Sequence, residues 1–116
     1  MSIKREELHS TDFSDIAIKG KRLPITEPGE ILLQDFMEPL GLSANALGNA
    51  LNVPPNRITG ILKKQRAITA DTALRLSRYF GNSAQFWLAL QVNYELEMAR
   101  LASGAQLQRE IKPRAA

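Results

Sequence analysis

The chain has 116 residues, of which 44% are hydrophobic, and it contains no cysteine. This length allows one domain of ordinary size, and the lack of cysteine excludes disulfides, thiolate metal sites and a cysteine nucleophile. The formal charge is +3, and no apolar run approaches the roughly 18 residues that span a bilayer. We therefore expect a soluble, cytoplasmic protein that does not enter a membrane.

The positive charge is concentrated in one stretch of the chain. No acidic residue occurs between Glu38 and Asp71. Four basic residues fall in that stretch: Arg57, Lys63, Lys64 and Arg66. The other 11 of the 15 basic residues are balanced by 12 acidic ones, so the remainder of the chain is close to neutral. A local basic patch is typical of a domain that binds a polyanion, although an ordinary solvated loop has the same composition.

Residues 1 to 27 are polar and show no sustained helical period, so we expect a flexible or partly ordered N-terminal arm. Helical spacing of apolar residues begins at Pro28, a residue type that is favoured in the first turn of a helix. Gly41 is predicted to end this first helix, because glycine readily adopts the left-handed conformation that closes a helix.

Two short helices separated by a tight turn are predicted next. Ser43 is a good N-cap for the first of them, and Asn52 suits the left-handed residue that ends it. Its buried side is expected to comprise Ala46, Leu47, Ala50 and Leu51. The following helix runs from about Pro55 to Lys63, with an apolar stripe of Ile58, Ile61 and Leu62.

Two further helices complete the predicted domain. Thr69 caps the fourth helix, and Ser83 caps a fifth and longest helix that covers residues 84 to about 102. Residues 103 to 116 are expected to form a frayed tail. The sequence thus predicts an all-α domain of five helices over residues 28 to 102.

The segment from Leu42 to Lys63 has the features of a helix-turn-helix, with the small residue Gly48 where the two helices would cross. Glycine lowers helix stability by about 1 kcal/mol relative to alanine, which a close approach of the two helices would explain. Any helical bundle needs tight corners. Here, however, the turn, the glycine, a polar helix face and the acid-free stretch coincide, and this coincidence indicates DNA binding.

Five short motifs in this order resemble the HigA (VapI-type) antitoxins, within the Xre and lambda-repressor-like group of five-helix DNA-binding domains. They are Pro-Gly-Glu-Ile-Leu at 28–32, Leu-Gly-Leu-Ser at 40–43, Val-Pro-Pro-Asn-Arg-Ile at 53–58, Ile-Thr-Ala-Asp-Thr-Ala-Leu-Arg-Leu at 68–76 and Phe-Trp-Leu at 86–88. The resemblance covers about residues 24 to 101. The chain departs from it at Ala44, where such proteins commonly have glutamine, and in an N-terminal arm longer than that of short members.

By motif position, the resemblance implies that eight residues contact DNA: Ser43, Asn45, Asn56, Arg57, Thr59, Lys63, Lys64 and Arg66. Pro55, at the entry to the third helix, and Gly60, on its polar face, are added as candidates. Arg57 can donate two hydrogen bonds to guanine, worth roughly 1–3 kcal/mol of discrimination, and Asn56 can do the same for adenine. The lysines and Arg66 suit phosphate contacts. For Gly60, close approach to the bases and helix packing are equally good explanations.

The resemblance also implies a dimeric autorepressor that binds a palindromic operator and a cognate toxin, usually a RelE-like ribonuclease that cuts messenger RNA. Four residues of the fifth helix are candidates for the dimer contact, although the aromatic ones also suit the core: Phe86, Trp87, Leu90 and Tyr94. No cofactor or metal is expected. The alternatives are a stand-alone regulator without a toxin and an interaction module that no longer binds DNA.

An enzyme is not expected from this sequence. It has no glycine-rich loop that could cradle a phosphate, no cluster of metal ligands, and no nucleophile with a histidine base nearby. Glu95 and Glu97 alternate on a predicted helix, so they point to different faces and do not form an acid and base pair. We therefore assign no catalytic residue.

Overall fold

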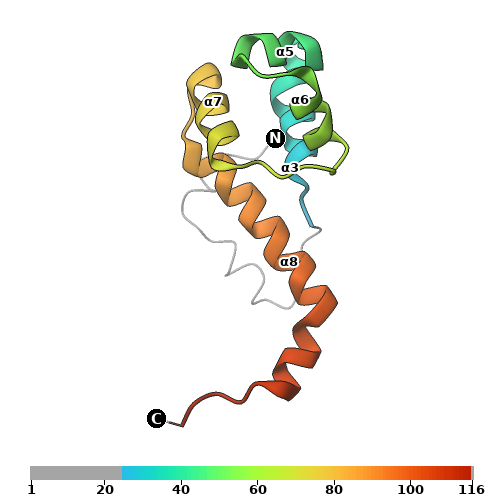
Figure 1. Cartoon of the computed structure of the whole chain (residues 1–116), viewed down its shortest axis with the longest axis vertical. Coiled ribbons are helices and arrows are strands. Elements are labelled where there is room, and N and C mark those ends of the chain that lie inside the picture. Colours follow the sequence, from blue (N-terminus) through green and yellow to red (C-terminus); the bar gives the residue numbers. More distant parts are fainter. Residues whose placement is uncertain (1–24, 116) are drawn as a thin grey trace.

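Every regular element in the described part of the chain is a helix. The computed structural model describes residues 25–115, so most of the expected N-terminal arm lies outside the described residues. The elements are α3 (Pro28–Ile31), the π-helix η1 (Leu32–Met37), α4 (Glu38–Leu40), α5 (Ala44–Leu51), α6 (Pro55–Leu62), α7 (Ala70–Phe80) and α8 (Ala84–Glu110). Because α3, η1 and α4 are contiguous, the five-helix all-α prediction is confirmed (Figure 1).

The first helix differs from the regular α-helix that was predicted, since its middle is a π-helix. The backbone N–H of Glu38 donates to the carbonyl of Leu33, five residues earlier, which is the hydrogen bond that defines a π-helix. Pro39 explains the departure, because proline has no N–H and its ring crowds the carbonyl four residues before it. The wider turn places both Leu32 and Met37 in the core.

The predicted helix caps are confirmed. The hydroxyl oxygens of Ser43 and Ser83 each accept a hydrogen bond of 3.0 Å from a backbone N–H in the first turn of the following helix. The hydroxyl of Thr69 accepts a longer one of 3.4 Å. Gly41 and Asn52 both adopt the left-handed conformation, with φ of 66° and 60°. Local side-chain chemistry therefore fixes where these helices begin and end.

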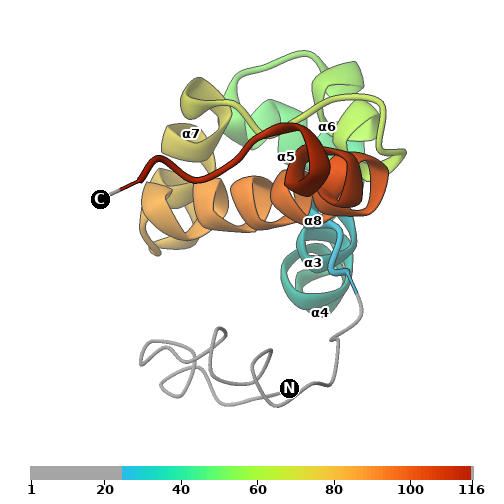
Figure 2. The ribbon, with the colours of Figure 1, turned by 90° about the horizontal axis from the view of Figure 1, so that it is seen from below.

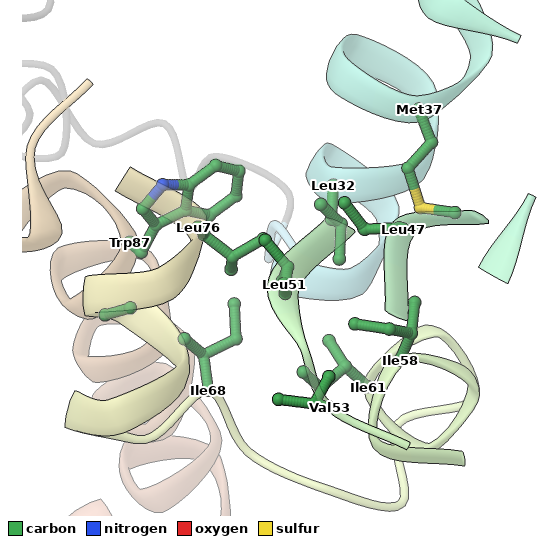
Figure 3. Packing of buried hydrophobic residues seen from close by; sticks show 11 residues of the cluster. Leu32, Met37, Leu47, Leu51, Val53, Ile58, Ile61, Ile68, Leu76 and Trp87 are labelled. Carbon is green, nitrogen blue, oxygen red and sulfur yellow. The ribbon is translucent and has the colours of Figure 1, made fainter. Parts of the chain in front are cut away.

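The core lies between two groups of helices, as Figure 3 shows. Leu76 of α7 and Trp87 of α8 form one side, and the buried residues of η1, α5 and α6 form the other. The Trp87 ring has no exposed surface, and its indole N–H donates to the side-chain oxygen of Asn82 at 2.9 Å. Phe36 packs against this indole with ring centroids 4.7 Å apart. Aromatic residues thus join η1 to the start of α8.

The prediction for the buried side of α5 is half wrong. Leu47 and Leu51 are buried, but Ala46 and Ala50 are exposed. Gly48 is buried in their place, because α5 presents this side to the turn and to α6. The sequence thus predicted correctly that Gly48 faces the neighbouring helix, but it predicted wrongly that Ala46 and Ala50 are buried.

The predicted end of the fifth helix is wrong as well. Ser103 and Gly104 do not stop α8, which continues to Glu110, so the expected tail is mostly helical. A single glycine lowers helix stability by only about 1 kcal/mol. Side chains four residues apart support the last turn, where the Gln106 amide donates to Glu110 at 2.9 Å. Pro113 lies shortly beyond the true end, as is common after a helix.

The second part of α8 projects from the bundle in Figure 1, and in the view from below in Figure 2 it points toward the viewer. We call residues 95–110 the distal half of α8. Its large apolar side chains are exposed, and they include Leu96, Met98, Leu101 and Leu107. None of the described helices combines the length and the apolar character that crossing a bilayer requires.

Candidate nucleic-acid interface

The helix-turn-helix is closed by a contact at Gly48. A β-carbon at this position would lie 3.0 Å from the carbonyl oxygen of Val53 and 3.2 Å from the Cα of Pro55. The prediction that Gly48 permits a close approach is therefore confirmed. The Val53 N–H donates to the Gly48 carbonyl at 2.9 Å, and this hydrogen bond fixes the turn that leads into α6.

Helix α6 has one buried face and one exposed face. Ile58 and Ile61 are buried, whereas Asn56 and Lys63, which lie opposite them at helical spacing, are exposed. Thr59 is half-buried. The candidate residues Ser43, Asn45 and Pro55 are exposed as well. The structure thus leaves the predicted polar face of α6 accessible to a large partner.

Arg57 is placed differently from the exposed position that was expected. It lies at the edge of the exposed face, with 28% of its side chain exposed, and its Nη1 donates to Asp71 Oδ2 at 2.6 Å. The same oxygen accepts a 2.9 Å hydrogen bond from Arg75 Nε. Arg75, and then Arg57, hold the pKa of the Asp71 carboxyl below its ordinary value by hydrogen bonding. The sequence did not predict this pairing.

Lys64 is drawn toward the start of α3. Its backbone is left-handed, with φ of 64°, and its ammonium lies 2.9 Å from Glu27 Oε2. The hydrogen bond with Glu27, together with the charge of that residue, raises the pKa of Lys64 above its ordinary value. Lys64, which was predicted to contact phosphate, is therefore already paired with an acid of its own chain.

Gly60 and Arg66 pack against each other. A β-carbon at Gly60 would lie 3.2 Å from the Cβ of Arg66, and the Gly60 carbonyl accepts hydrogen bonds from Gln65 and Arg66. Of the two explanations for this glycine, the geometry favours local packing. Within residues 25–115, neither Lys63 nor Arg66 forms an ion pair, so their charges are available at the surface.

The four candidate dimer residues have different environments. Trp87 is completely buried inside the chain, so it is a core residue and offers no surface to a partner. Phe86, Leu90 and Tyr94 are half-buried. Leu96, Met98 and Leu101 lie within the predicted fifth helix but were not among the predicted dimer contacts, and Leu107 falls in the stretch that was expected to be a tail.

Comparison with known proteins identifies the family. Residues 33–87 match the family model described as Helix-turn-helix. Virulence-associated protein I of Dichelobacter nodosus is 57% identical over 77 residues, which cover 66% of this chain and 71% of that protein. Antitoxin HigA-1 of Vibrio cholerae is 36% identical over 73 residues, which cover 63% and 68% of the two chains. The chain belongs to the HigA and VapI-type family.

A solved HigA structure shares the fold of this HigA-type chain. The Pseudomonas aeruginosa antitoxin HigA with higBA promoter aligns with a TM-score of 0.77 and 43% identity. The alignment covers 79% of this chain and 100% of that chain. The family resemblance that the five sequence motifs indicated is thereby confirmed.

Proposed function

We propose that this HigA-type chain is a sequence-specific DNA-binding repressor and the antitoxin of a HigBA-type toxin–antitoxin module. The observation that supports this most is the exposed polar face of α6, supported by α5 through the contact at Gly48. The fold is shared with an antitoxin HigA that was solved with promoter DNA. In this arrangement, α6 is the helix that enters the major groove.

The residues of α6 and the following loop divide between two tasks. Arg57 and Asn56 contact base edges, for which arginine and asparagine have the donor and acceptor geometry. Lys63 and Arg66 contact phosphates, where positive charge adds affinity and salt dependence but little sequence preference. Lys64 contributes less than these two, because Glu27 already neutralises it.

Dimerisation through α8 supplies the second recognition helix. Leu90 and Tyr94 continue along one face of the helix into Met98 and Leu101, at spacings of three and four residues. Two copies that pair along this face bury side chains which a single chain leaves exposed. The two recognition helices then contact half-sites about 34 Å apart, in an operator that is an inverted repeat.

The proposed toxin is a RelE-like ribonuclease encoded beside this gene. Support for this part comes from relatives named as antitoxins. Co-expression with the neighbouring short reading frame, followed by affinity purification, tests it. A stable complex that suppresses the toxicity of the second protein is expected. Failure to find a toxic neighbour would leave a stand-alone regulator.

DNA binding is tested by fluorescence anisotropy with the chain's own upstream DNA and a scrambled duplex over a range of salt concentrations. We expect tight, salt-sensitive binding to the upstream DNA, weakened at least about fivefold by Arg57→Ala, which removes one bidentate base contact. Arg109→Ala is the control, since it removes the same charge from an exposed position near the end of α8. Equal weak binding to both duplexes would contradict the proposal.

A further inference from the structure

Two arginines from different helices meet at one carboxylate oxygen beside the recognition helix. Arg57 of α6 donates to Asp71 Oδ2 at 2.6 Å, and Arg75 of α7 donates to the same atom at 2.9 Å. Asp71 lies in the first turn of α7, a few residues after the basic loop that follows α6. The carboxylate therefore lies at the same end of α7 as the proposed DNA contacts.

Arg75 is itself fixed to the turn of the helix-turn-helix. Its Nη1 donates to the carbonyl of Leu51 at 2.9 Å and, at the longer distance of 3.4 Å, to that of Asn52. These carbonyls belong to the end of α5, where the helix leaves its acceptors without partners of its own. Arg75 therefore links the Asp71 carboxylate to the turn between α5 and α6, which is the turn that sets the direction of α6.

We infer that Asp71 is a positioning residue that fixes the guanidinium of Arg57 for base recognition and thereby sets specificity at one base pair of each half-site. This inference rests on the proposed function. An arginine has five N–H donors in a rigid fork. Asp71 engages Nη1, and the other edge of the fork stays available for the two acceptors of a guanine.

The position of Arg57 explains why it needs such a partner. It begins at the edge of the exposed face of α6, between the buried side and the side that faces outward, so an unpartnered guanidinium would have a wide choice of directions. Holding one edge before DNA arrives removes much of the ordering that binding otherwise requires. The discrimination between bases is then greater than that of a freely rotating arginine.

A purely structural role accounts less well for the cluster. The Asp71 side chain is 56% exposed, and ion pairs at such positions contribute little to folding because water screens them. An acid beside the recognition helix also repels the phosphate backbone, so its presence disfavours binding to any duplex. A gain in orientation explains why a carboxylate at this place is compatible with DNA binding.

The test is Asp71→Asn, which keeps the size of the side chain and removes its charge. Binding is measured by anisotropy against the upstream duplex, a scrambled duplex, and a series in which each base pair of one half-site is replaced. We expect the ratio of upstream to scrambled affinity to fall about fivefold, toward the low end of one bidentate base contact. The loss should be confined to one G·C pair, while scrambled binding stays equal or becomes tighter.

Two further variants separate positioning from other effects. Glu110→Gln makes the same charge change at the far end of α8 and should leave the ratio unchanged. In an Arg57→Ala background, Asp71→Asn should lower the ratio no further, because there is no guanidinium left to position. A loss that persists in that background, or one spread evenly over all base pairs, would overturn the inference. Circular dichroism checks that each variant is folded.

Failure of the inference and failure of the proposed function give different results. If the unmodified chain prefers its upstream duplex and Asp71→Asn keeps the full ratio, the inference is wrong and the repressor function stands. If the unmodified chain shows no preference for any duplex, the proposed function is wrong and the inference is overturned with it.

Discussion

The helix-turn-helix and the distal half of α8 both carry apolar residues at helical spacing, but only the first region buries them. Leu47 and Ile58 have no exposed surface, whereas Leu101 is 59% exposed. The difference lies in the neighbours, because α5 and α6 pack against each other while the distal half of α8 extends beyond the bundle (Figure 1). Apolar spacing therefore predicts a helix and its face, but not what covers that face.

The two regions also become helical for different reasons. Helices α5 and α6 have eight residues each, which is too short for a helix to be stable alone in water, so packing holds them. The distal half of α8 continues a helix that is already nucleated, and each added residue gains a hydrogen bond without a new nucleus. It can therefore stay helical while its apolar side chains are exposed.

The largest expected difference comes from paired truncations in the packed core and in the distal half. Trp87→Ala should lower the free energy of unfolding by about 3–5 kcal/mol, since the whole buried indole is lost. Leu101→Ala should change it by less than about 0.5 kcal/mol at dilutions where the chain is monomeric, and should weaken self-association instead. Urea denaturation and sedimentation measure the two effects. Equal losses of stability in the two variants would contradict the distinction between a packed core and an exposed distal half.

A smaller difference in stability is expected between two glycine substitutions, one in each region, which should change the free energy of unfolding in opposite directions. Gly48→Ala should destabilise the chain by about 1–3 kcal/mol, because its β-carbon would press on the backbone of the turn. At Gly104 the nearest atom that an added β-carbon would meet is the Cβ of Arg100, 4.0 Å away. Gly104→Ala should therefore stabilise α8, by up to about 1 kcal/mol. Thermal unfolding measures both changes in stability. A Gly48→Ala variant more stable than the unmodified chain would contradict the close contact at Gly48.

The smallest expected effect is on how the stability of the chain depends on pH in the acid range. The pKa of Asp71 is lowered in the folded chain, so its contribution to stability is complete above the ordinary value of 3.8 and is lost as the pH falls through the lowered one. Asp71→Asn should therefore flatten the decline of the melting temperature below about pH 4. Glu110→Gln in the distal half should leave this decline unchanged. An identical decline in all three proteins would show that the carboxylate contributes nothing.

Sequence predicted the features that depend on neighbours along the chain. The caps at Ser43 and Thr69 and the left-handed Asn52 follow from side-chain and backbone chemistry within a few residues. The π-helix and the extension of α8 were not predicted, because each depends on a small difference in free energy between two backbone conformations. Pro39 only tips the first helix from one hydrogen-bond pattern to another, and the glycine at 104 is outweighed by the helix around it.

The same division applies to the candidate site. The outer face of α6 was predicted from helical spacing, and the structure leaves Asn56 and Lys63 exposed there. The ion pair of Arg57 was not predicted, because Asp71 is 14 residues away along the chain and meets it only after α7 has packed. Such pairings are set by tertiary structure, and a charge pattern alone does not show which acid a given arginine will meet.

The π-helical stretch of the first helix has a consequence for how related chains are aligned. A π-helical turn holds more residues than an α-helical turn, so η1 accommodates an extra residue without changing the direction of the helix on either side. A relative with one residue fewer between 32 and 37 can form a regular α-helix there and still match both ends. Removal of one residue is therefore expected to be tolerated better within η1 than at the turn before α6.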